Sequence, residues 1–267
     1  MERKLPIISI EGTDFLVDVE NSMLRERANM ENTISILHMK ESQRGYEFIY
    51  DRLTKRMSIW STVDEVRVAV TVPELVDLDP VGMSQKYGVP LEELKSKNDF
   101  EIMVDQEALR RRLDGELPTI EIGGHSFFVD IAADKLRPAG HSKTGGLSFT
   151  EIESCYDDEK EAYIITFNTK NGKYQPLDFE KLDAIPAGIV AVSIPFELRL
   201  DVIGFIRRYK SEEFQFLKEY NVSMQFKAQE VTWREFGLPG HIKLPDKAAV
   251  NLERKNEPRS RKRGRGL

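Results

Sequence analysis

Apolar and polar residues alternate near the start of the chain, as they do in a half-buried β-hairpin. Ile8 and Ile10 precede, and Phe15 and Val17 follow, a polar segment that contains Gly12. Alternation with a period of two predicts strands, and glycine suits the positive φ of a tight turn. We therefore predict a hairpin with Gly12 in its turn. The same pattern recurs at Ile120, Ile122, Phe127 and Val129 around Gly123 and Gly124.

Two further hairpins are predicted by strand-forming residues on either side of a polar turn. They lie at residues 46–60 (YEFIYDRLTKRMSIW) and 162–177 (AYIITFNTKNGKYQPL). In the second, Asn171 and Gly172 suit the positive φ of a tight turn.

Two runs of β-branched residues predict the centre of the sheet. Residues 66–72 (VRVAVTV) and 189–194 (IVAVSI) are nearly continuous apolar segments. Such runs are typical of strands that are buried on both faces, so we expect them to be central strands. Pro73 and Pro195 follow them and should end them.

Helix-starting residues follow each of these runs. Asp79 stands before Pro80, and Asp201 holds the same place before residues 202–210 (VIGFIRRYK). An aspartate at the N-cap and a proline in the first turn both favour a helix start. The weaker signals that follow predict short helices at 91–97 and 212–220, and then extended segments at 101–104 and 223–226. The last helix of each copy is predicted to end at a glycine, Gly115 or Gly237.

The chain resembles two diverged copies of one unit. Residues 5–19 align with residues 117–131 with eight of fifteen positions identical, and residues 68–87 align with 190–209 with eight of twenty identical. Two matching blocks in the same order predict an internal duplication. Because strands precede helices in each copy, the predicted fold class is α+β, with a largely antiparallel sheet and helices in the C-terminal half of each unit. The predicted domains are 1–115, 116–240 and a basic tail at 241–267.

Composition places the chain among ordinary globular proteins. The 267 residues are 40% hydrophobic, and no stretch approaches the 18 apolar residues of a membrane span. A single cysteine, Cys155, excludes an internal disulfide. We expect a soluble cytoplasmic protein with no membrane partner.

Charge is distributed unevenly along the chain. Residues 253–267 hold seven basic and two acidic residues, a net charge of +5, so the first 252 residues carry −11 of the total of −6. The tail lacks apolar periodicity and is rich in glycine and arginine, which predicts disorder and favours contact with phosphate backbones. The candidate residues for binding DNA or RNA are Arg259, Arg261, Lys262, Arg263 and Arg265. A solubility tail, a clamp on the acidic body and a contact with an acidic protein are the alternatives.

Sequence motifs for catalysis or cofactor binding are not found. Residues 140–146 (GHSKTGG) lack the spacing of a phosphate-binding loop and read as a flexible loop. His125, His141 and Cys155 could together form a metal site. We favour the alternative interpretation, in which they are a polar turn residue, a loop residue and a small buried thiol. No catalytic, cofactor-binding or metal-binding residue is therefore assigned, and no cofactor is expected.

The carboxylates have structural explanations. Asp18 and Asp130 follow the second strand of each copy and are expected to cap the backbone there. Asp79 and Asp201 are predicted N-caps, and residues 157–159 (DDE) are a charged turn between strands.

The motifs LPxIxIxGxxFxVD, at the head of each unit, and VxVxxPxxxxLD, in its middle, carry a resemblance. With the basic end, the chain resembles an uncharacterised family of internally duplicated bacterial proteins linked to mobile-element and accessory gene content. That resemblance implies no activity, cofactor or catalytic residue.

The expected function is that of a non-enzymatic accessory protein. Its duplicated body would bind an unidentified protein partner, and its tail would bind nucleic acid. The alternatives are a pure protein-interaction scaffold and an enzyme whose site lies between the two repeats.

Overall fold

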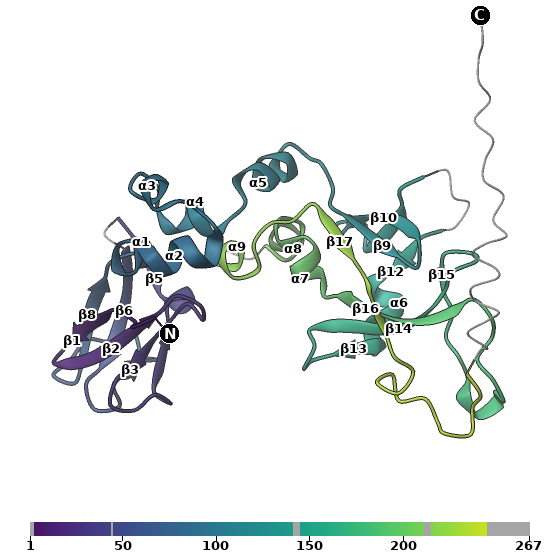
Figure 1. The fold of residues 1–267 in the computed structure, drawn as a ribbon, viewed down its shortest axis with the longest axis horizontal. Helices are drawn as coiled ribbons and strands as arrows, with labels where there is room; N and C mark the ends of the chain where they lie inside the picture. Colours follow the sequence, from purple (N-terminus) through teal and green to yellow (C-terminus); the bar gives the residue numbers. More distant parts are fainter. Residues whose placement is uncertain (1–2, 44, 141–144, 211–214, 245–267) are drawn as a thin grey trace, which may run out of the picture. The chain divides into compact units, whose positions relative to one another are not determined.

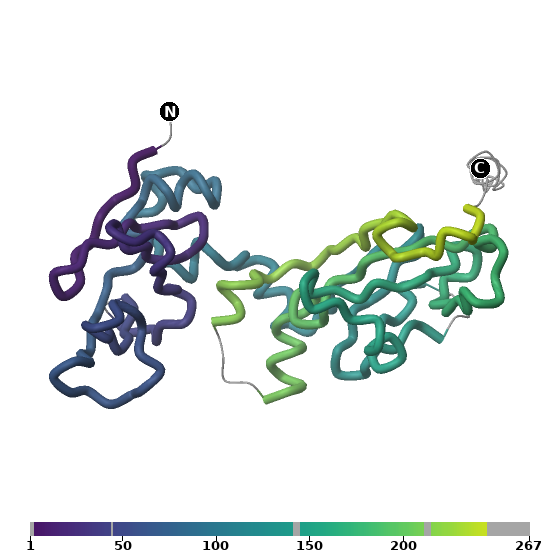
Figure 2. The backbone as a smooth tube through the Cα atoms, turned by 90° about the horizontal axis from the view of Figure 1, so that it is seen from below, coloured from purple at the N-terminus to yellow at the C-terminus, as the bar shows by residue number. Residues whose placement is uncertain are grey.

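The fold is mixed α+β, as predicted, with sheets that are almost entirely antiparallel. The computed structural model describes residues 3–43, 45–140, 145–210 and 215–244 (Figures 1 and 2). The chain divides into two compact units. Unit 1 combines Met1–Leu113 with Ser211–Val222, and unit 2 combines Asp114–Lys210 with Ser223–Leu267.

Unit 1 contains two sheets, ordered β1-β2-β3-β4 and β5-β6-β7, with β8 paired to β6. Phe15, Tyr46 and Tyr50 are the largest side chains buried in its core. The strands are β1 (Ile7–Ile10), β2 (Thr13–Asp18), β3 (Met23–Glu26), β4 (Thr33–Ser35), β5 (Lys40–Ser42), β6 (Gly45–Asp51), β7 (Arg56–Met57) and β8 (Arg67–Val72). The helices are η1 (Ile36–His38), α1 (Leu75–Leu78), α2 (Pro80–Tyr87), α3 (Leu91–Leu94), α4 (Asp99–Met103), α5 (Gln106–Leu113) and α9 (Phe216–Tyr220).

Unit 2 also contains two sheets, ordered β12-β11-β10-β9-β17 and β13-β14-β16-β18, with β15 paired to β14. Phe127, Phe149 and Phe167 are buried in its core. The strands are β9 (Thr119–Ile122), β10 (His125–Asp130), β11 (Lys135–Pro138), β12 (Leu147–Ser148), β13 (Tyr156–Asp157), β14 (Ala162–Asn168), β15 (Lys173–Tyr174), β16 (Ile189–Pro195), β17 (Gln225–Lys227) and β18 (Gln229–Val231). The helices are α6 (Phe149–Ile152), η2 (Glu153–Cys155), η3 (Phe179–Lys181), α7 (Glu197–Leu200) and α8 (Val202–Tyr209).

The predicted hairpins are confirmed. β1 pairs with β2 across a turn in which Glu11 and Gly12 have φ values of 48° and 77°, and β9 pairs with β10 across Gly123 and Gly124, at 54° and 85°. The pairs β6–β7 and β14–β15 form the other two hairpins. These turns are encoded locally, because only a few residue types tolerate a positive φ.

One of the two predicted central strands is an edge strand. β16 pairs with β14 on one side and β18 on the other, as predicted for a central strand. β8 pairs with β6 alone among the strands described, and Ala69 and Thr71 are exposed. The physical reason lies elsewhere in the chain: the residues that align with β18 form part of α5 in unit 1, so β8 lacks a second partner.

Two further predictions are wrong. Residues 101–104 were expected to be extended, but residues 101–103 belong to α4, because Asn98 and Glu101 form a reciprocal capping box with two 2.9 Å hydrogen bonds. The last helix expected before Gly237 is replaced by β18 and a series of turns. There, the pairing of Val231 with Ala191 supplies long-range hydrogen bonds that local propensity does not predict.

The predicted helix caps are confirmed in both units. The Asp79 carboxylate accepts a hydrogen bond from the Gly82 amide at 2.9 Å, and Asp201 accepts one from the Gly204 amide at 2.9 Å. α2 and α8 begin at the residues that follow. The side chains of both aspartates therefore satisfy an amide that the helix itself leaves unpaired.

Other aligned residues also make matched contacts. Asp18 accepts a hydrogen bond from Arg25 Nε at 2.6 Å, and Asp130 accepts one from Arg137 Nε at 2.7 Å. Both aspartates also cap a backbone amide, as predicted. In addition, a basic side chain of a helix donates a hydrogen bond to the carbonyl just after the second strand of each unit. Lys86 of α2 donates to Val19 at 2.9 Å, and Arg208 of α8 donates to Ile131 at 2.6 Å. The duplication stays a prediction, since α5, β17 and β18 break the correspondence.

Gly82 lies against an ion pair. Arg3 donates two hydrogen bonds of 2.6 Å to the Asp79 carboxylate, and a Cβ at position 82 would lie 2.3 Å from Asp79 Oδ2. We expect Gly82→Ala to lower the free energy of unfolding by about 1–3 kcal/mol, because overpacking outweighs the gain in helix propensity. Urea denaturation measures this. Gly140→Ala, where the added Cβ meets open space, is the control, and a Gly82→Ala protein as stable as the control would contradict the explanation.

Unit 1 includes a helix from far along the chain. Lys218, in α9, has a side chain that is only 3% exposed, and its Nζ lies 2.5 Å from Glu41 Oε1 and 3.3 Å from the Tyr46 hydroxyl. The Asn221 side chain accepts a hydrogen bond from the Asp105 amide at 2.8 Å. Residues 211–222 therefore belong to the first compact unit, whereas the predicted boundaries placed them in the second repeat.

Asp99 is the centre of the buried polar cluster beneath Lys218. Its carboxylate accepts hydrogen bonds from the Tyr46 hydroxyl at 2.5 Å and from the amides of Leu75 and Val76 at 2.7 and 2.8 Å. Burial raises the pKa of the Asp99 carboxyl and also that of the Tyr46 hydroxyl. Because Asp99 is 1% exposed, we interpret this cluster as structural.

The start of the predicted tail packs against unit 2. Ile242 is 6% exposed, and the Lys243 amide donates a 2.9 Å hydrogen bond to the carbonyl of Asp183. Residues 245–267 lie outside the described residues.

Candidate functional site

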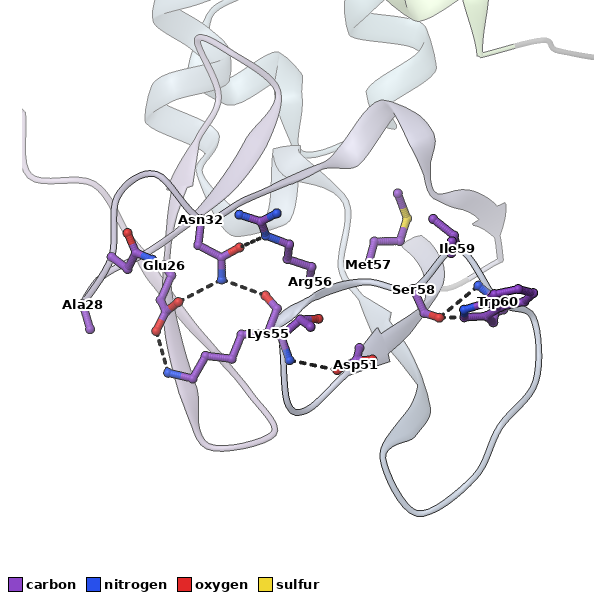
Figure 3. Close-up of a pocket in the computed structure, with 12 residues that line it drawn as sticks. Glu26, Ala28, Asn32, Asp51, Lys55, Arg56, Met57, Ser58, Ile59 and Trp60 are labelled. Atoms are coloured by element: carbon purple, nitrogen blue, oxygen red, sulfur yellow. Dashed lines mark hydrogen bonds and ion pairs between the residues drawn. The ribbon is translucent and has the colours of Figure 1, made fainter.

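The strongest candidate site is a pocket of about 660 Å³ in unit 1 (Figure 3). It lies between the β3–β4 loop, the β6–β7 hairpin and the three residues that follow β7. Its lining residues are Glu26, Ala28, Asn29, Asn32, Asp51, Thr54, Lys55, Arg56, Met57, Ser58, Ile59 and Trp60.

A hydrogen-bonded network forms the polar side of the pocket. Asn32, 3% exposed, donates to Glu26 Oε2 at 2.8 Å and to the Lys55 carbonyl at 3.0 Å. Its own Oδ1 accepts a hydrogen bond from Arg56 Nε at 2.9 Å. Glu26 also forms a 2.6 Å ion pair with Lys55. Asn32 thus uses both ends of its amide to join the two loops.

The charges of this network are matched to each other, with one exception. The hydrogen bonds from Lys55 and Asn32 hold the pKa of Glu26 below its usual value, and the same contact raises the pKa of Lys55. Arg56 is exposed and makes no ion pair in the part of the chain that the structure describes. Its guanidinium donates through Nε to Asn32, and its two terminal nitrogens make no hydrogen bond to the described residues. Of the two cations that line the pocket, Lys55 is paired with Glu26, and Arg56 has no ion pair among the described residues.

The other side of the pocket is apolar and exposed. Ile59 is 90% exposed and Trp60 is 62% exposed. The backbone of Trp60 is nevertheless held, because Ser58 Oγ accepts from the Trp60 amide at 3.0 Å and donates to its carbonyl at 3.1 Å (Figure 3). The Ser58 amide in turn donates to the Ile49 carbonyl at 2.7 Å. A fixed backbone thus presents a large apolar ring to solvent.

Three further apolar side chains in this part of unit 1 are exposed. Met30, in the β3–β4 loop, is 47% exposed, Leu53, in the β6–β7 loop, is 78% exposed, and Val63 is 60% exposed. Single exposed apolar residues are ordinary, but several of them on neighbouring loops around one pocket are typical of a contact surface.

A smaller pocket of about 320 Å³ lies beside β15 in unit 2. It is lined by Lys135, Gly145, Gly146, Ser148, Glu151, Lys173 and Tyr174. β15 is the second strand of its hairpin, as β7 is in unit 1. The described lining is polar and contains no tryptophan, so its chemistry differs from that of the unit 1 pocket.

The residues considered for a metal site have other contacts. His125 Nε2 lies 2.7 Å from the Thr169 carbonyl, and Cys155 Sγ, half-buried, lies 3.6 Å from the Tyr174 hydroxyl. His141 lies outside the described residues. Among the residues that the structure places, no group of three His, Cys, Asp or Glu side chains is arranged to hold a metal ion.

The predicted nucleic-acid-binding residues Arg259, Arg261, Lys262, Arg263 and Arg265 all lie outside the described residues, so their role stays a prediction. The sequence does not predict the pocket, because the strand-forming residues 46–60 predict a hairpin that includes Ile59 and Trp60. A signal is present: an Ile-Trp pair is followed by residues 61–65 (STVDE), four of which are polar, so the segment does not continue an apolar strand face.

Comparison with protein-family models, with curated proteins and with solved structures finds no match. The resemblance to a duplicated bacterial family therefore stays a prediction, and function has to be argued from this chain alone. Within the described ranges, no helix has the length and apolar character needed to cross a membrane.

Proposed function

We propose that this chain is a non-enzymatic accessory protein that binds a protein partner through its body and nucleic acid through its basic tail. The observation that supports the first part is the exposed Ile59–Trp60 pair on the rim of the unit 1 pocket. Burial of large aromatic side chains dominates the energetics of many protein interfaces.

The polar groups of the pocket favour binding over catalysis. Catalysis requires a nucleophile or a base with an available proton site, often with a pKa moved towards neutrality. Here Glu26 is neutralised by Lys55 and its pKa moves away from neutrality. The Ser58 hydroxyl is engaged with the backbone of Trp60. An enzyme with a site between the repeats is the less supported alternative.

The nucleic-acid part of the proposal rests on the charge of the tail. Residues 253–267 carry +5, while the rest of the chain carries −11. An acidic body repels a polyanion, so the tail is the segment suited to contact phosphates, through charge and counterion release.

We expect the logarithm of the affinity for DNA or RNA to fall with the logarithm of the salt concentration, with a slope of about −3 to −5. This follows from five cations that each release about 0.7 to 0.9 counterions. Fluorescence anisotropy with a labelled oligonucleotide measures it. Replacing Arg259, Arg261, Lys262, Arg263 and Arg265 together with glutamine should remove most binding and flatten the slope.

The matched control for this measurement is Lys95→Gln, which removes an exposed cation of the body. It should leave both affinity and slope unchanged. If the intact protein fails to bind either nucleic acid at about 50 mM salt, where phosphate contacts are strong, the tail has no such role and a pure protein-interaction scaffold becomes the better proposal.

A further inference from the structure

We infer that the unit 1 pocket binds a segment of a partner protein in which a carboxylate lies beside an apolar side chain. This inference deepens the proposed function and rests on its protein-binding part. It assigns that binding to one surface and gives the partner's chemistry.

The apolar half of the recognition comes from Ile59 and Trp60. Their side chains are 90% and 62% exposed, so a partner would remove a large apolar area from water. The indole of Trp60 makes no hydrogen bond or ring contact within the described part of the chain. Because Ser58 already fixes the Trp60 backbone, less loop entropy is lost on binding. The fixed backbone and the indole of Trp60, which is unpaired among the described residues, are therefore suited to a contact surface.

The polar half of the recognition comes from Arg56. Its Nε is held by Asn32, which fixes the plane of the guanidinium, and its terminal nitrogens have no carboxylate partner in the described ranges. A planar guanidinium with two free nitrogens matches a carboxylate bidentately. Glu26 does not compete for it, because Glu26 pairs with Lys55 at 2.6 Å. Arg56 is therefore the cation of the lining with which a single anionic group can pair.

The surroundings favour a protein carboxylate over a nucleic-acid backbone. Glu26 and Asp51 line the pocket, and Glu31 lies in the β3–β4 loop beside it. A chain of phosphates would meet these carboxylates as well as Arg56, whereas one carboxylate flanked by apolar groups would meet Arg56 and Trp60. Met30 and Leu53, in the two loops that contribute lining residues, are also exposed apolar side chains.

The test is selection of short random peptides displayed on phage against the full chain, followed by measurement of their affinity for Trp60→Ala and Arg56→Gln. We expect recovered peptides that place Asp or Glu beside an aromatic or aliphatic residue. Their affinity should fall at least about tenfold with Trp60→Ala and about tenfold or more with Arg56→Gln. Leu91→Ala, at an exposed apolar residue of α3, and Lys95→Gln are the matched controls and should not change the affinity.

A double-mutant cycle places the carboxylate on Arg56. Changing the peptide Asp or Glu to its amide should cost about as much as Arg56→Gln, and the combined change should cost little more. In a Trp233→Phe protein, Trp60 is the one tryptophan left of two, and its emission should move to shorter wavelength as peptide binds. Unchanged thermal unfolding of each variant excludes a folding defect.

Four results would overturn the inference. If the peptides bind Trp60→Ala and Arg56→Gln as tightly as the unaltered chain, the proposed protein binding stands, but it takes place on another surface. Peptides that need no carboxylate, or an oligonucleotide that displaces the peptide and itself shifts Trp60 emission, would refute the chemistry. Recovery of no specific peptide would count against both this inference and the protein-binding part of the proposed function.

Discussion

Replacing Asp99 with alanine is expected to lower the free energy of unfolding by about 3–5 kcal/mol, because three buried hydrogen-bond donors lose one acceptor. The change leaves the Tyr46 hydroxyl and the amides of Leu75 and Val76 without their acceptor in a site that is 1% exposed. Unpaired buried donors keep the full penalty of losing water. Lys218 also loses a compensating charge nearby. Urea or thermal denaturation of the full chain measures the loss.

The matched control is Asp105→Ala. Asp105 also accepts a helix amide, that of Ala108 at 2.9 Å, but it is exposed and has no tyrosine or lysine partner among the residues that the structure describes. Its loss should cost about 1 kcal/mol, the ordinary value of an N-cap. Equal losses for the two variants would show that Asp99 acts only as a cap and would refute the buried cluster as a stabilising centre.

A chain that ends at residue 115 is expected not to fold into the stable unit seen in the full protein. It lacks α9, whose Lys218 contacts Glu41 and Tyr46 and whose Leu217 is 4% exposed. Removing α9 uncovers Tyr46, which is 1% exposed in the full chain. Circular dichroism during thermal unfolding should show a broad transition at low temperature in place of a cooperative one.

The control for this truncation is a chain that ends at residue 244, which keeps every element that the structure describes. It should unfold as the full chain does. If residues 1–115 alone unfold cooperatively at the same temperature as this control, the assignment of residues 211–222 to the first compact unit is wrong.

Local signals explain what could be predicted of the fold. Gly12 and the Gly123–Gly124 pair specify tight turns because few other residues adopt a positive φ, and both hairpins are present. Asp79 and Asp201 cap helices within three residues of themselves. Such features need no information from distant parts of the chain, so a single sequence is sufficient to find them.

Long-range pairing explains what could not be predicted. Residues 66–72 and 189–194 have similar composition, but β16 gains β18 as a neighbour while β8 stays at an edge. Residues 101–104 carry strand-forming side chains, yet the capping box of Asn98 and Glu101 begins a helix. The composition of a segment does not specify which distant strand will pair with it. That pairing decides whether a strand lies at the centre or at the edge of its sheet.

The candidate site also depends on distant residues. Asn32 and Arg56 come from different hairpins, and only the folded chain places Asn32 Oδ1 2.9 Å from Arg56 Nε. The basic tail, in contrast, is evident from composition alone, and its role stays a prediction. The sequence therefore predicts a nucleic-acid partner, and the structure adds a pocket from which we propose protein binding.

The measurement that tests the central claim most directly is affinity capture from the native host with three forms of the full chain, each with and without nuclease. These are the unaltered protein, Trp60→Ala, and the form with glutamine at Arg259, Arg261, Lys262, Arg263 and Arg265. We expect the Trp60→Ala form to keep nucleic acid but to lose a protein that the unaltered chain still captures after nuclease treatment. We expect the glutamine form to lose nucleic acid and to keep that protein. Capture of the same molecules by all three forms would contradict the central claim.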